Sequence, residues 1–174
     1  QFLGLIDLLF LSSLIKNQAT CYLGLKYFHG IVSHFPSLLA DPNLQNESIP
    51  LYLLILEIAE NDTVFKSRNE SFLIIMNGIN AEIFTHDFLK EHYNRIIDIF
   101  FEFVENNASV VHFLLSMMMK LCTFLIDSGI DVGSIQSIFN EKDADQILSR
   151  INHDSDDNLD DDIRALFSVI NYNE

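Results

Sequence analysis

The sequence is poor both in helix-breaking residues and in cysteine. It has six glycines and three prolines in 174 residues, which excludes collagen-like, linker-like and turn-dense β architectures. Its two cysteines, Cys21 and Cys122, form no Cys-x-x-Cys or Cys/His spacing, so we expect no zinc site. Both are expected to be small buried thiols of a reducing compartment. We therefore expect an intracellular protein of the cytoplasm or nucleus.

Basic residues are also scarce. Ten Lys and Arg stand against 25 Asp and Glu, which gives a net charge of −15. Such a surface repels a phosphate backbone and has no basic stripe that could release counterions, so direct nucleic-acid binding is not expected. A basic segment of another protein is the partner that this charge would attract. The simpler interpretation is that the charge keeps an apolar protein soluble.

Apolar residues make up 49% of the chain, which excludes disorder as its general state. They recur at spacings of three and four, without sustained alternation, and this pattern predicts an all-α fold. Ser48 is expected to cap the third helix with Pro50 in its first turn, Gly129 to end a helix, and Asp131 to cap the next. The predicted helices cover about 2–16, 19–39, 48–60, 63–79, 84–106, 108–127, 132–140, 143–152 and 159–171.

Two apolar stretches invite a membrane interpretation. Residues 2–11 are interrupted by Asp7 and lack the basic region and cleavage site of a signal peptide. The helix at 108–127 carries Lys120 inside an apolar run that is short for a bilayer. We therefore expect no membrane association. The opening apolar run, which begins without Met, suggests a piece of a longer polypeptide.

Consecutive pairing of the predicted helices starts pairs near residues 2, 48, 84 and 132. This pairing and spacing resemble those of armadillo and HEAT repeats, whose units are helical hairpins of about 40–47 residues. The resemblance implies stacked antiparallel hairpins, an α-solenoid fragment covered by neighbouring repeats of the parent chain. It would consist of a helical-repeat core at 1–127, with about three helix pairs, and an acidic helical extension at 128–174. A compact helical bundle would give the same helices and stays an alternative.

Polar residues form narrow lines on two of these helices. In the helix at 19–39 the line lies opposite an inward face that includes Phe35 and Leu38, and a similar line steps along the helix at 108–127. The acidic tail offers a third polar surface. The simpler interpretation of all three is a solvated edge or linker. We predict these surfaces to bind a partner through Lys26, His29, Ser33, His112, Ser116, Lys120, Asp156, Asp157 and Asp160.

No combination of residues predicts catalysis, a metal or a cofactor. The aspartates from Asp154 alternate as in a calcium loop, but Leu159 and Ala165 stand where such a loop needs Gly and Glu. The sequence therefore predicts a non-catalytic protein–protein interaction or scaffold module of a larger regulatory protein. A compact bundle that binds an amphipathic helix in a hydrophobic groove is the alternative. A remote one, an all-α HD-type metal phosphohydrolase, rests on the dipeptides His86-Asp87 and His153-Asp154.

Overall fold

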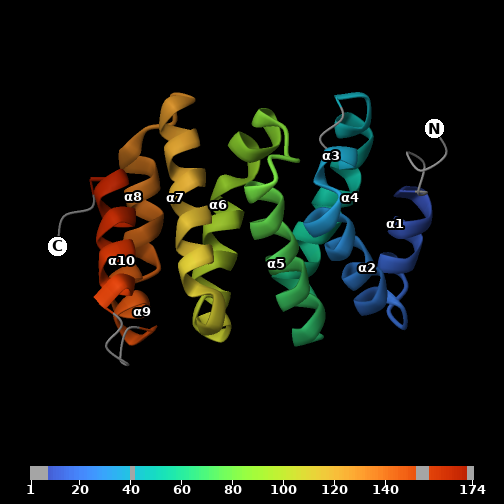
Figure 1. The fold of residues 1–174 in the computed structure, drawn as a ribbon, viewed down its shortest axis with the longest axis horizontal. Coiled ribbons are helices and arrows are strands. Elements are labelled where there is room, and N and C mark those ends of the chain that lie inside the picture. The colour runs from blue at the N-terminus through green and yellow to red at the C-terminus, as the bar shows by residue number, and fades with distance from the viewer. Residues whose placement is uncertain (1–7, 40–41, 152–156, 172–174) are drawn as a thin grey trace. The chain divides into compact units, whose positions relative to one another are not determined.

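The computed structural model describes residues 8–39, 42–151 and 157–171, and within these ranges every regular element is a helix. The all-α prediction is therefore confirmed. Figure 1 shows the helices, coloured from the N-terminus to the C-terminus. They are α1 (Leu8–Lys16), α2 (Cys21–His34), α3 (Pro36–Leu39), α4 (Pro42–Asn61), α5 (Phe65–Asn80), α6 (His86–Phe103), the 3₁₀ segment η1 (Glu105–Val110), α7 (Val111–Asp127), α8 (Val132–Glu141), α9 (Ala144–Ile151) and α10 (Asp157–Val169).

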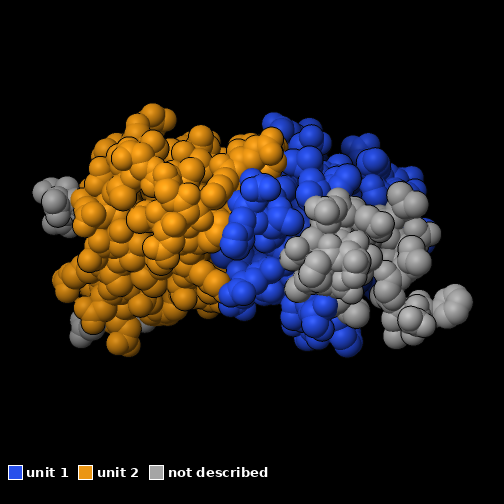
Figure 2. Space-filling view, turned by 90° about the horizontal axis from the view of Figure 1, so that it is seen from above, with its two compact units in different colours: residues 1–88 blue, residues 89–174 orange. Residues whose placement is uncertain are grey.

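The chain divides into two compact units, residues 1–88 and residues 89–174 (Figure 2). The first therefore ends within the first turn of α6, and the second contains the rest of α6 with α7 to α10. This division differs from the predicted boundary between a core at 1–127 and an extension at 128–174. The difference has a physical reason, since α10 packs closely on α7 and buries Leu166 and Ile170 completely. The acidic C-terminal segment thus helps to build the core of the second unit.

The helix predicted at 19–39 is interrupted at Phe35. A proline disfavours the helical conformation of the residue before it, and Phe35, which precedes Pro36, has φ −135° and ψ 46°. Helix α2 therefore ends at His34, and α3 is a separate short helix. The prediction that Phe35 points inward is wrong, since 59% of this residue is exposed. Leu38 was also predicted to point inward, but its side chain lies outside the described residues.

Helix α4 begins six residues earlier than predicted. Its first residue is Pro42, a position where the missing N–H of proline leaves no hydrogen bond unmade. Ser48 is therefore inside the helix and does not cap it, and Pro50 lies in the interior. The signals at the start of α8 are confirmed: Gly129 adopts φ +86°, and the Asp131 carboxylate accepts a hydrogen bond from the backbone N–H of Ser134 at 3.1 Å.

In the first unit, α1 and α2 form an antiparallel hairpin closed by the turn at residues 17–20. The Thr20 hydroxyl donates to the Leu14 carbonyl at 2.7 Å. A methyl group on Gly24 would lie only 2.9 Å from Ile15 Cγ1, so this glycine allows the two helices to approach closely. Helices α4 and α5 form a second hairpin, and α2 lies beside α5. The two run in the same direction, because Lys26 contacts Glu70 and His29, further along, contacts Asn77.

Aromatic rings fill the centre of the first unit. Tyr52 of α4 is 1% exposed, and its ring meets Phe84 edge-on at 4.9 Å between centroids and Phe88 at 5.9 Å. Phe28 of α2 lies 6.4 Å from the same ring. Tyr52 therefore packs against aromatic rings of α2 and of the segment at 84–88.

The second unit is built from α6 to α10. Helix α6 is followed by α7, and α7 packs against α10. Near the C-terminal ends of α6 and α8, Phe101 and Phe139 pack edge to face with centroids 4.9 Å apart. Phe139 also contacts Phe167 of α10, at 6.5 Å. These rings therefore join α6, α8 and α10 into one core.

One segment, Glu105–Asp127, is long and apolar enough to cross a membrane by length and composition alone, a test that the core helices of globular proteins also pass. Its α7 part buries one side within the second unit. The buried residues of α7 are Val111, Leu114, Leu115, Met117, Met118, Leu121, Cys122 and Leu125. The polar residues His112, Ser116 and Thr123 of the same helix are exposed. This distribution is typical of a core helix with one edge in water.

Candidate functional site

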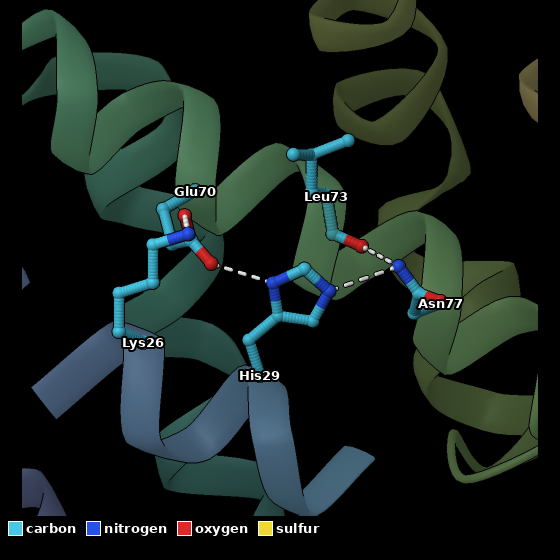
Figure 3. Close-up of polar contacts among 5 residues, drawn as sticks. All are labelled: Lys26, His29, Glu70, Leu73 and Asn77. Atoms are coloured by element: carbon cyan, nitrogen blue, oxygen red, sulfur yellow. Dashed lines mark hydrogen bonds and ion pairs between the residues drawn. The ribbon is translucent and has the colours of Figure 1, made fainter. Parts of the chain in front are cut away.

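Two of the residues predicted to bind a partner, Lys26 and His29, are held by a buried carboxylate. Glu70 of α5 is 3% exposed. Its Oε2 lies 3.0 Å from Lys26 Nζ, and its Oε1 lies 2.5 Å from His29 Nδ1. Figure 3 shows the carboxylate between the two basic side chains of α2, with Asn77 on the far side of the imidazole. We call Lys26, His29, Glu70 and Asn77 the Glu70 cluster.

Asn77 fixes the proton on the imidazole of His29. Its Nδ2 donates to the backbone carbonyl of Leu73 at 2.9 Å, and because a carbonyl only accepts, the orientation of the amide is set. The same Nδ2 lies 3.1 Å from His29 Nε2. Nε2 must then accept, so Nδ1 carries the proton that the ring donates to Glu70. The hydrogen bonds therefore run in one direction, from the amide through the ring to the carboxylate.

These contacts shift the pKa of two groups in the Glu70 cluster. Burial raises the pKa of the Glu70 carboxyl, but the hydrogen bonds from His29 and Lys26 outweigh burial and hold the pKa below its ordinary value. The hydrogen bond to Glu70 raises the pKa of Lys26. At neutral pH the cluster therefore contains a carboxylate and an ammonium that neutralise each other. Its charges join α2 to α5, and Glu70 is too deeply buried to meet a partner.

We expect the Glu70 cluster to stabilise the fold less at acid pH. Replacement by Glu70→Gln should lower the free energy of unfolding by about 1–3 kcal/mol at neutral pH, because it weakens two buried hydrogen bonds to a charged group. The folded pKa is lowered, so the unfolded chain takes up the proton first, near its ordinary value of 4.5. The stabilisation is thus complete above that value and is lost as the pH falls through the folded pKa.

Urea unfolding of the wild type and of Glu70→Gln, measured at several pH values from 7 down to about 3, tests this expectation. The difference between the two proteins should shrink on acidification. Glu57→Gln is the matched control, because Glu57 is an exposed glutamate in the same unit, and it should change stability by less than about 0.5 kcal/mol. A difference that stays constant or grows at low pH would contradict the assigned role of the carboxylate.

The remaining predicted site residues are not members of the Glu70 cluster. Ser33 is exposed near the end of α2. In the second unit, His112 Nδ1 lies 2.7 Å from Asp162 Oδ2 of α10, so this part of the α7 line contacts the chain's own last helix. Ser116 is exposed and Lys120 is half-buried on the same helix.

The acidic residues of the prediction lie in or before α10. Asp160 lies within 3.9 Å of Arg164, and Asp157 is the first residue of α10, although its side chain lies outside the described residues. Asp156 is also outside the described residues. Leu159 is buried in α10, so the stretch that was compared with a calcium loop is helical from residue 157 onward. The predicted acidic surface is thus described only in part.

Glu70 was not among the predicted site residues, although the spacing of the residues around it indicates that it is buried. Ser67, Glu70, Ser71 and Gly78 recur at helical intervals on one side of α5, and all four are buried. Three of them are small, which favours close approach of another helix. A glutamate on the same side of the helix as these small residues is buried with them. A buried carboxylate needs basic partners. Lys26 and His29, three residues apart on α2, supply them.

Helix α2 also has an exposed apolar face that was not predicted. Leu23 is 68% exposed and Tyr27 is 54% exposed, one helical turn apart. Gly30 and His34 continue the same side of the helix, and a methyl group on Gly30 would meet nothing within 4 Å. We call Leu23, Tyr27, Gly30 and His34 the α2 outer face. Large exposed apolar side chains at helical spacing are a feature of surfaces that bind other molecules.

The described residues give little support for catalysis or metal binding. No group of three or more His, Cys, Asp and Glu side chains in the described ranges could hold a metal ion. His86 and Asp87 are both exposed at the start of α6, and His153 and Asp154 lie outside the described residues. Burial raises the pKa of the Cys122 thiol to about 12, so little thiolate is present at neutral pH.

Comparisons with protein-family models, with curated proteins and with solved structures find no match to this chain. The geometry of the chain is therefore the basis for assigning its function.

Proposed function

We propose that this chain is a non-catalytic protein-interaction module, part of a larger intracellular scaffold or regulatory protein, which binds a segment of a partner on a helical surface. The observation that carries the proposal is the α2 outer face. Leu23 and Tyr27 are large apolar residues one helical turn apart, and the first unit leaves both of them mostly in water. A surface of this kind gains free energy when a partner covers it.

The helix arrangement supports a module of the armadillo or HEAT type. In the first unit α1–α2 and α4–α5 are hairpins whose second helices lie side by side and parallel. In the second unit α7 and α10 lie side by side, and His112 near the start of α7 meets Asp162 in the first half of α10. Repeated hairpins that bury a continuous core offer rigid outer surfaces for binding.

The position of the Glu70 cluster favours a partner surface other than the predicted line of Lys26, His29 and Ser33. Lys26 and His29 already contact Glu70, and a ligand that recruited them would leave a buried carboxylate without partners. That cost makes them poor contacts for a ligand. The outer face lies next to the cluster on α2 and needs no such exchange.

A comparative capture experiment tests the proposal. The wild type, a Leu23→Ser/Tyr27→Ser variant and a Val64→Ser/Val110→Ser control should be immobilised and exposed to the same cell extract. The control removes two other exposed apolar residues. We expect some proteins to be retained by the wild type and the control but not by the Leu23→Ser/Tyr27→Ser variant. Each such protein, once purified, should bind the wild type and the control with higher affinity than it binds this variant. Equal retention by all three would argue against a binding role for α2.

A further inference from the structure

We draw no further inference here: the strongest candidate, the α2 outer face of Leu23, Tyr27, Gly30 and His34, carries none because Lys26 on the same helix is paired with the buried Glu70 carboxylate, and nothing in the part of the chain that the structure describes shows what covers the face.

Discussion

Replacement of Tyr52 by alanine should lower the free energy of unfolding by about 3–5 kcal/mol, the range found for removing a large aromatic side chain from a core. Tyr52 is 1% exposed, and its ring contacts Phe28, Phe84 and Phe88. Its loss would leave a cavity that these rings border. Because domains of this size are stable by only about 5–15 kcal/mol, the variant should unfold at a much lower urea concentration.

Tyr27→Ala is the matched control for this prediction. It removes the same atoms from a residue that is 54% exposed on α2, and it should change stability by about 0.5 kcal/mol or less. Urea titrations followed by far-UV circular dichroism measure both variants. If Tyr27→Ala proved as destabilising as Tyr52→Ala, the aromatic cluster would not be the centre of the first unit.

Two glycine-to-alanine substitutions should change stability in opposite directions. Alanine is favoured over glycine within a helix by about 1 kcal/mol. At Gly78, however, the new methyl group would lie 2.6 Å from Phe84 Cε2 and 3.2 Å from Ile83 Cδ1. The Phe84 ring is held between Tyr52 and Phe88, at centroid distances of 4.9 and 5.1 Å. We expect overpacking of about 1–3 kcal/mol to exceed the helix gain, so that Gly78→Ala destabilises.

At Gly30 the outcome should be reversed. A methyl group there meets no atom within 4 Å, so Gly30→Ala should stabilise the protein by about 0.4–1 kcal/mol through the lower entropy of its unfolded chain. Thermal unfolding of the two variants beside the wild type gives the sign of each effect. Stabilisation by Gly78→Ala would mean that Phe84 does not pack on Gly78 as described, and destabilisation by Gly30→Ala would contradict the open space at Gly30.

The order of the helices follows from local properties of the sequence. Apolar spacing predicted the all-α fold, and the signals at Gly129 and Asp131 placed the start of α8 correctly, because capping depends on a few adjacent residues. The break at Phe35 could also have been found, since Pro36 restricts the residue before it. The start of α4 was harder to predict, because Ser48 is a good capping residue and the structure does not use it as a cap.

Only part of the candidate site could be predicted from the sequence. The periodicity of α2 correctly placed Lys26 and His29 on one side, but it could not show that α5 presents Glu70 to them. The two segments are more than forty residues apart in the chain, and their contact exists only after both hairpins have formed. The same contact turns Lys26 and His29 from predicted ligand contacts into partners of a buried acid.

Composition and apolar spacing are enough to establish that the chain is acidic, that it is helical, and that α7 is an apolar helix with one polar edge. Which charges are paired inside the protein, and which apolar side chains stay in water, depends on how the helices pack. Leu23 and Tyr27 resemble core residues in composition, yet α1 and α5 pack against other sides of α2 and leave these two exposed. Exposure depends on which sides of a helix its neighbours cover, and amphipathic spacing does not specify those neighbours.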